Sequence, residues 1–450
     1  MLKGYLVPHP PLIVNGIGKG DEIPATKEAY KQIAEEIKLI NPQTVVIISP
    51  HSVMYSDYIH IAPGGGAKGD FGAFGVKNIK FEAGYDSELT SLIEKLAKER
   101  GIHAGALGEK SPVLDHGVMV PLYFIKAERI VRISISGLSV TEHYKLGMCI
   151  ADAIKRLKRN AVIIASGDMS HKLKADGPYG FAPEGPEFDN FVCDCIRKGG
   201  LRELLSIEPS LCESAAECGY KSIVMLLGAF DGIKTDCRLL SYEGPFGVGY
   251  LTASFTANGE TESLLSLISA DKQKKLEKIR ASESEYVRIA RQNVENFVLT
   301  GKKISGGQIS QSMLNSRAGV FVSIKKDGML RGCIGTIRPA QKNIYEEILE
   351  NGISAASRDP RFDPVEENEL DSLVYSVDIL SPAEPISSKA ELDVNRYGVI
   401  ARYGRRSGLL LPALEGVNTV DEQISIALRK AGINQDEPYS LERFEVVRHK

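Results

Sequence analysis

The chain has 450 residues, of which 43% are hydrophobic and 25% are charged, and these values are typical of a globular protein with two or three domains. The formal net charge of −3 indicates no nucleic-acid surface, and no apolar run approaches the roughly 20 residues that span a bilayer. The proline-broken N-terminus does not read as a secretory signal. Seven cysteines without a C-x-x-C pair argue against a disulfide framework and a zinc knuckle, and favour the cytoplasm.

Strand-like and helix-like stretches alternate from residue 1 to about residue 256. The predicted strands are "GYLVP", "TVVIIS", "RIVRISI", "AVIIAS" and "GVGYLTASF". The predicted helices include "TKEAYKQIAEEIKLI", "DSELTSLIEKLAKERG", "TEHYKLGMCIADAIKRLK" and "EFDNFVCDCIRKGGLRELL". This alternation favours an α/β fold with a mainly parallel sheet and helices on both faces. The glycine-rich stretches "PGGGAKGDFG" and "GPFGVGY" lack the context of phosphate-binding motifs and are predicted to be loops.

The remaining chain predicts a linker and a second domain. Residues 257–272 are polar without a clear core pattern, so we place the linker there. Residues 273–450 begin with the helical pattern "SEYVRIARQNVENFVL" and continue with a hairpin, for which Asp327-Gly328 is a type I′ turn signal. A second hairpin is predicted around Gly404. Hairpins with segregated helices predict a separate α+β domain.

Histidines follow several of the predicted strands. His9 comes after "GYLVP", His51 comes after "TVVIISP", and His171 lies in the loop after "AVIIAS". Because the ends of parallel strands meet at one edge of a sheet, these imidazoles are expected to face one pocket. His116 begins an apolar helix, with Asp115 as its expected N-cap. Two histidines and one carboxylate make a facial site for iron(II), which leaves positions open for substrate and dioxygen.

The third ligand is expected just before the apolar helix "SIVMLLGAF". Glu213 and Glu217 lie in the preceding segment, and Glu217 is placed at the N-terminal edge of the helix. From spacing alone, Glu217 either completes the metal site or complements the helix dipole.

Five motifs occur in order within residues 3 to 255: "VPHPP", "ISPHS", "LDHGVMVPL", "SGDMSH" and "ECGYKSIVMLLGA". This series resembles that of class III extradiol dioxygenases of the LigB type, and equally that of the related Memo proteins. The resemblance implies that His9 and His51 are metal ligands and that His171 is the catalytic acid–base. It also implies that His116 contacts the substrate or supports the ligands. Asp168 would support the loop that carries His171.

The resemblance leaves the third ligand open, because Glu217 is followed by Cys218-Gly219. Catechol-cleaving members use a carboxylate there, whereas Memo-like members have a cysteine in a "CG" pair. Neighbouring residues of a helix point about 100° apart, so Glu217 and Cys218 are not expected to bind the same metal. Glu217 would fit iron(II) and the cleavage of a small aromatic diol by dioxygen. Cys218 would favour copper or zinc.

The second domain has its own unusual stretch, "MLRGCIGTIRP". Cys333 is flanked by glycines, with Arg331 and Arg338 nearby, so it is either an activated thiol or a buried cysteine in a tight bend. Together with "NGISAASRDPRFDPVEENEL" and further motifs, this stretch makes residues 275 to 448 resemble the AMMECR-one family. The resemblance implies the fold of this domain but no particular reaction. We expect any ligand at the "RGCIGT" face. Beside Arg331 and Cys333, the residues of this candidate surface are Arg358, Asp359 and Arg361.

Fusions of these two domains resemble the AmmeMemoRadiSam grouping, which implies a radical-SAM protein as a partner. The leading hypothesis is therefore a cytoplasmic, iron(II)-dependent dioxygenase-like protein that carries an AMMECR-one domain. The alternative is a Memo-like metal-binding or redox protein that acts with the radical-SAM partner and does not cleave catechols. A homo-oligomer is compatible with the sequence.

Overall fold

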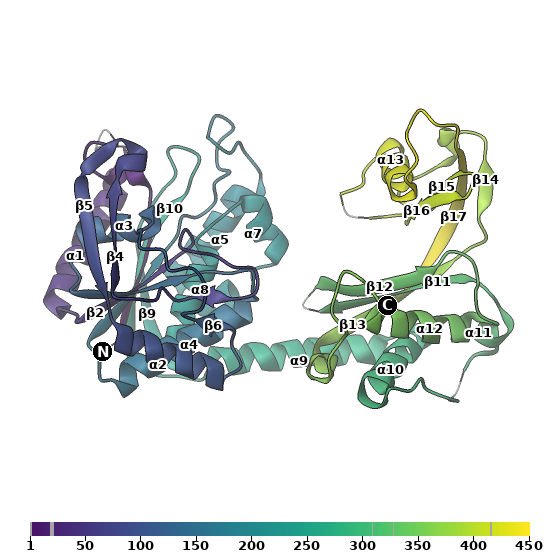
Figure 1. Ribbon diagram of the computed structural model, residues 1–450, viewed down its shortest axis with the longest axis horizontal. Helices are drawn as coiled ribbons and strands as arrows, with labels where there is room; N and C mark the ends of the chain where they lie inside the picture. The colour runs from purple at the N-terminus through teal and green to yellow at the C-terminus, as the bar shows by residue number, and fades with distance from the viewer. Residues whose placement is uncertain (1, 19–21, 308, 327, 415) are drawn as a thin grey trace. The chain divides into compact units, whose positions relative to one another are not determined.

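The computed structural model describes residues 2–18, 22–307, 309–326, 328–414 and 416–450. The chain divides into two compact units, residues 1–269 and 270–450, which are coloured purple to teal and teal to yellow in Figure 1. Segment 257–272, predicted as the linker, contains the end of strand β10 (Tyr250–Glu260) and the first half of helix α9 (Leu264–Ser282). Among the described residues, no helix has both the length and the apolar character needed to cross a membrane.

Eight strands of the described residues form the central sheet of the N-terminal unit, in the order β4-β5-β7-β2-β8-β1-β10-β9. Strands β5, β7, β2, β8 and β1 pair in parallel, and the flanking pairs are antiparallel. The predicted mainly parallel sheet is therefore confirmed. Besides β10, the strands of this sheet are β1 (Lys3–Val7), β2 (Thr44–Ser49), β4 (Gly66–Phe71), β5 (Val76–Tyr85), β7 (Arg129–Ser134), β8 (Ala161–Ser166) and β9 (Ile233–Glu243). The short strands β3 (Ile59–His60) and β6 (Ala104–Gly105) pair with each other.

Helices cover both faces of this sheet (Figure 1). Strand β2 is buried along its whole length, because Val45 and Ile47 enter one hydrophobic cluster and Val46 and Ile48 enter the other. Burial on both faces explains the unbroken apolar run from Val45 to Ile48 in this strand. The helices are α1 (Pro24–Ile40), α2 (Ser87–Glu99), α3 (His116–Phe124), α4 (Val140–Arg156), α5 (Glu184–Lys198), α6 (Leu201–Leu204), α7 (Pro209–Ala215) and α8 (Tyr220–Ala229).

Helices α4 and α8 touch through their backbones. A Cβ atom built on Gly147 of α4 would lie 2.0 Å from the carbonyl oxygen of Met225. A Cβ atom on Gly228 of α8 would lie 1.9 Å from the carbonyl oxygen of Tyr144. The two glycines therefore permit an approach that any side chain would block. This contact sets the position of α8, and Cys218-Gly219 directly precedes that helix.

Three strands of the sheet, β4, β5 and β9, were not predicted, and β5 is an inner strand whose residues are mostly half-buried or exposed. "PGGGAKGDFG" was predicted to be a loop, but Gly66–Phe71 forms edge strand β4, which pairs with β5. Strand β9 lies at the opposite edge, and nearly all of its residues are half-buried or exposed. An edge strand buries little surface, so neither sequence carries the apolar run that marks the inner strands.

The C-terminal unit contains an antiparallel sheet in the order β12-β11-β13-β17-β15-β16 among the described residues. The first predicted hairpin is confirmed, with Lys326 paired to Met329, while Asp327 lies outside the described residues. The second is confirmed around Gly404, where Tyr403 pairs with Arg406. The elements are α10 (Glu285–Thr300), α11 (Gln311–Asn315), β11 (Gly319–Lys326), β12 (Met329–Thr336), α12 (Ile344–Ser357), β13 (Leu373–Leu380), β14 (Glu384–Ile386), β15 (Tyr397–Tyr403), β16 (Arg406–Leu410), α13 (Val420–Ala431) and β17 (Ser440–His449).

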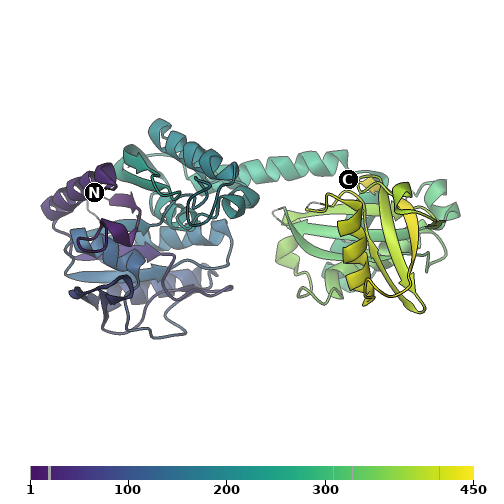
Figure 2. The same ribbon diagram turned by 90° about the horizontal axis from the view of Figure 1, so that it is seen from above.

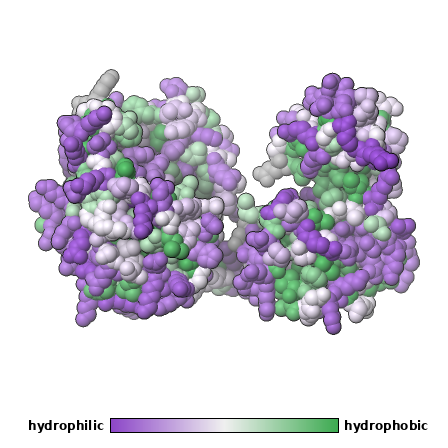
Figure 3. Space-filling model, viewed as in Figure 1, coloured by the Kyte–Doolittle hydropathy of each residue, from purple (hydrophilic) through white to green (hydrophobic). Residues whose placement is uncertain are grey.

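Each half of this sheet has its own helical cover. Helices α10 and α12 share a cluster with β11 and β13, and α13 packs on β15 and β16. Figure 2 shows the later, yellow elements overlying the earlier, green ones. The face drawn in Figure 3 is mainly hydrophilic, with hydrophobic residues gathered between these two halves. The separate α+β fold predicted for this part of the chain is therefore confirmed.

Candidate metal centre

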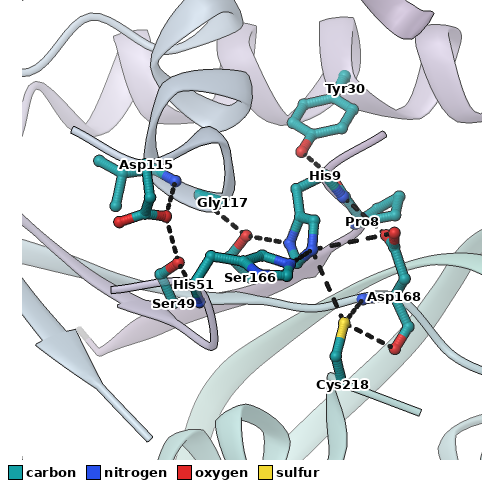
Figure 4. Close-up of polar contacts among 11 residues, drawn as sticks. Pro8, His9, Tyr30, Ser49, His51, Asp115, Gly117, Ser166, Asp168 and Cys218 are labelled. Carbon is teal, nitrogen blue, oxygen red and sulfur yellow. Dashed lines mark hydrogen bonds and ion pairs between the residues drawn. The ribbon is translucent and has the colours of Figure 1, made fainter. Parts of the chain in front are cut away.

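His9 lies just beyond the end of β1 and is 1% exposed. Its Nδ1 lies 2.9 Å from Ser166 Oγ, and that hydroxyl donates to the carbonyl of Gly117 at 2.6 Å. Because the Ser166 proton is used by Gly117, Nδ1 of His9 carries a proton and donates to Ser166. This arrangement leaves a lone pair on Nε2, which points toward the other site residues (Figure 4).

The rings of His51 and His116 meet His9 at this edge of the sheet. His51 follows β2, and its Nε2 lies 3.0 Å from Nε2 of His9. The ring centroid of His116 lies 4.1 Å from that of His51 and 5.2 Å from that of His9. Asp115 caps α3 through the N–H of Val118, as predicted. Its carboxylate also accepts from the hydroxyls of Ser49 and Ser52 at 2.6 Å each, which fixes the start of α3 beside the loop that carries His51.

Cys218 and Asp168 approach His9 from another side. The Sγ atom of Cys218 lies 3.7 Å from His9 Nε2 and accepts a hydrogen bond from the backbone N–H of Asp168 at 3.2 Å. Asp168 Oδ1 accepts from the backbone N–H of His9 at 2.8 Å, and Oδ2 lies 3.9 Å from His9 Nε2. Burial raises the pKa of the Cys218 thiol and raises that of Asp168 to about 7. His9 is thus shared by two groups of candidate ligand atoms, one with His51 and His116 and one with Asp168 and Cys218.

A glycine pair allows Cys218 to reach this position. A Cβ atom on Gly167 would lie only 2.2 Å from the Cα atom of Gly219. The loop after β8 and the segment before α8 therefore pack backbone against backbone. This contact brings the N–H of Asp168 within hydrogen-bonding distance of Cys218.

Glu217 has a different role in the structure. Its carboxylate accepts the backbone N–H of Tyr220, the first residue of α8, at 2.6 Å. Burial raises its pKa to about 7. Among the described residues, Glu217 is not in either group of ligand atoms around His9. The carboxylate therefore caps the helix, and the neighbouring thiol faces the histidines.

His171 also lies near the histidine cluster. Its ring stacks on Tyr179 with the centroids 5.0 Å apart, and its pKa is lowered by burial and then by the charge of His51. Burial and the charge of His51 lower the pKa of His116 to about 4. Both rings are therefore held neutral at pH 7, in the form that can accept a proton.

The C-terminal candidate residues separate into several contacts. Asp359 accepts from the backbone N–H of Cys333 at 2.9 Å and pairs with Arg361, whose guanidinium holds the pKa of that carboxyl well below its usual range. Arg331 binds the carboxylate of Glu369 and two backbone carbonyls. Arg358 pairs with Glu350 at 2.6 Å. The structure therefore brings Cys333, Asp359 and Arg361 together. Arg331 and Arg358 instead pair with Glu369 and Glu350.

Sequence models of two families match the chain. The one described as the catalytic LigB subunit of aromatic ring-opening dioxygenase matches residues 3–253, which is more than half of the chain. The AMMECR1 model matches residues 287–449. The chain belongs to the LigB family, with a C-terminal AMMECR1 domain.

Several proteins are similar to all or part of this chain. Protein CA_C1420 of Clostridium acetobutylicum is 42% identical over 99% of this chain and 98% of its own length. A Thermotoga maritima protein is 49% identical over 37% of this chain and 98% of its own length. The crystal structure of the uncharacterized protein PH0010 from Pyrococcus horikoshii matches with 32% identity and a TM-score of 0.34, over 36% of this chain and 88% of that one. The crystal structure of the uncharacterized protein JW3007 from Escherichia coli matches with 16% identity and a TM-score of 0.42, over 56% of this chain and 99% of that one.

The sequence did not reveal four residues of the candidate metal centre: Ser166, Gly117 and the glycine pair Gly167 and Gly219. Ser166 pairs with Val7 in the parallel register of β8 and β1, so it ends its strand beside the segment that carries His9. Its position at the end of an apolar strand was the available signal. Gly117 and Gly219 gave none, because their roles depend on contacts between segments far apart in the chain.

Proposed function

We propose that the N-terminal unit is a Memo-like metal-binding redox protein in which His9, His51 and Cys218 hold one metal ion. The observation that supports this proposal is the position of the third ligand. The Cys218 thiol lies 3.7 Å from His9 Nε2, whereas the Glu217 carboxylate caps helix α8. A soft thiolate with two imidazoles suits copper(I) or zinc better than the iron(II) of a carboxylate facial site.

Two pairs of these atoms, His9 with His51 and His9 with Cys218, are spaced as ligands of one ion are, whereas His51 and Cys218 belong to separate groups of candidate ligand atoms and would have to approach each other when the ion binds. Two imidazole nitrogens about 2.1 Å from one metal lie about 3.0 to 3.4 Å apart, and a nitrogen and a thiolate sulfur lie about 3.6 Å apart. The separations here are 3.0 Å between the Nε2 atoms of His9 and His51 and 3.7 Å between His9 Nε2 and Cys218 Sγ. The protonated Nδ1 of His9 also leaves Nε2 as its metal-binding atom. When bound, the metal would supply a Lewis acid and, in the case of copper, an electron-transfer centre.

The chain's own groups orient this site. Ser166 fixes the ring of His9, and the N–H of Asp168 supports the thiolate form of Cys218 through a hydrogen bond. The neutral ring of His171 is suited to take a proton from a hydroxyl group of a bound substrate.

The second candidate function is iron(II)-dependent cleavage of an aromatic diol by dioxygen. It is favoured by the LigB match over residues 3–253 and by the two further imidazoles, His116 and His171, around the same centre. In this reaction, His171 would take a proton from the diol.

Oxygen uptake by protein loaded with iron(II) under anaerobic conditions separates the two functions. We expect no diol-dependent uptake and no coloured semialdehyde with a panel of catechols, while metal binds stoichiometrically and is lost in His51→Ala. Uptake with a new visible chromophore that disappears in His51→Ala would replace the proposed function with the second candidate.

A further inference from the structure

A cavity of about 470 Å³ adjoins the proposed metal centre at Cys218. Its volume lies within the range of small-molecule sites. Cys218 is part of the cavity wall, so a molecule in the cavity would approach the proposed metal past the Cys218 thiolate. Its lining residues are Met54, Tyr55, Ser56, Ile135, Ser136, Gly137, Glu217, Cys218 and Lys221.

The walls of this cavity are fixed to one another. The N–H of Gly137 donates to the carbonyl of Tyr55 at 3.0 Å, and a Cβ atom on Gly137 would lie 2.4 Å from the carbonyl oxygen of Ser56. The hydroxyl of Tyr55 accepts the backbone N–H of Glu109 at 2.8 Å. The two loops that line the cavity are therefore held in contact before any ligand binds, which lowers the entropic cost of binding.

Lys221 supplies the cationic group among the described lining residues. Its Nζ donates to the carbonyl of Ser136 at 2.6 Å and to that of Leu138 at 3.1 Å. These bonds hold the ammonium in place, and its third N–H has no acceptor among the described residues. Lys221 also lies in the first turn of α8, where the helix dipole is positive. The cavity therefore combines the positive charge of Lys221 with the apolar side chains of Met54 and Ile135. The Glu217 carboxylate in the same wall also acts on Lys221, but it accepts the backbone N–H of Tyr220 and leaves the third N–H of Lys221 without an acceptor among the described residues.

We infer that this cavity binds a small organic carboxylate, with the carboxylate group on Lys221 and the apolar body against Met54, Tyr55 and Ile135. One remaining N–H on one cation matches a single negative charge, whereas a phosphate dianion would bring a second charge without a partner. The inference deepens the proposed function, since it gives the class of substrate that would lie beside the Cys218 centre.

The test measures ligand binding to the metal-free, reduced, full-length protein, so that it does not depend on metal loading. The probes are phenylacetate and its neutral analogue phenylacetamide, and the readout is the ¹³C-methyl resonance of Met54, assigned with Met54→Leu. We expect phenylacetate to shift this resonance saturably and phenylacetamide to bind about tenfold more weakly. Lys221→Met should remove this preference, whereas Lys221→Arg and the surface control Lys198→Met should keep it.

Equal affinity for the two probes, an unshifted Met54 resonance, or a preference that survives in Lys221→Met would overturn the inference. If Lys221→Met does not fold, the comparison of the two probes on the wild-type protein and Lys221→Arg still decides. A purely structural role for Lys221 would not distinguish the two probes. Metal binding by the same preparation is measured separately, so failure here with a metal site that depends on Cys218 would leave the proposed function standing.

Discussion

Replacing Cys218 with alanine is expected to lower the affinity of the protein for zinc or copper(I) by at least about 100-fold, because it removes one of three proposed ligands. Glu217→Gln is expected to keep the affinity within about threefold, since the amide oxygen can still accept the N–H of Tyr220 that the carboxylate accepts now. The affinities are measured by competition with a chromophoric chelator under reducing, anaerobic conditions.

Cys237→Ala is the matched control for this pair. Cys237 lies on β9, is half-buried, and contacts the carbonyl of Thr235 rather than the histidines. Cys237→Ala should therefore leave the affinity for zinc or copper(I) unchanged. A loss of affinity in Glu217→Gln, together with retention in Cys218→Ala, would contradict the ligand assignment and favour a carboxylate centre.

Gly147→Ala is expected to destabilise the N-terminal unit by at least about 2 kcal/mol, because the new methyl group meets the backbone of α8. Helix propensity alone predicts the opposite sign, with a gain of about 1 kcal/mol for alanine over glycine. The measurement is the free energy of unfolding in urea, followed by circular dichroism on the full-length protein.

Gly352→Ala in helix α12 provides the matched comparison. A Cβ atom there would have its nearest neighbour, a methyl group of Val294, at 3.4 Å. This is an ordinary contact, so helix propensity should dominate and the variant should be at least as stable as the wild type. Stabilisation by both substitutions would show that α4 and α8 do not pack as closely as the structure indicates.

Much of the fold could be predicted because the inner strands carry strong signals. "TVVIIS" and "AVIIAS" must be buried on both faces, and the structure places both inside the sheet. The edge strands β4 and β9 and the inner strand β5 were not predicted, since strands whose residues are mostly half-buried or exposed carry no apolar run. Their pairing depends on partners distant in sequence.

The site was predictable to the level of the imidazoles and no further. His9 and His51 follow buried strands that run parallel in one sheet, and this topology brings their rings together. The choice between Glu217 and Cys218 depends on where helix α8 begins and on the contact of Gly167 with Gly219. Neighbouring residues in the sequence cannot reveal either feature.

X-ray absorption spectroscopy of the protein loaded with one equivalent of zinc tests the central claim most directly. The account predicts one sulfur ligand at about 2.3 Å together with imidazole nitrogens at about 2.0 to 2.1 Å. The sulfur contribution should vanish in Cys218→Ala and persist in Glu217→Gln. A wild-type spectrum with only nitrogen and oxygen ligands would contradict the thiolate centre.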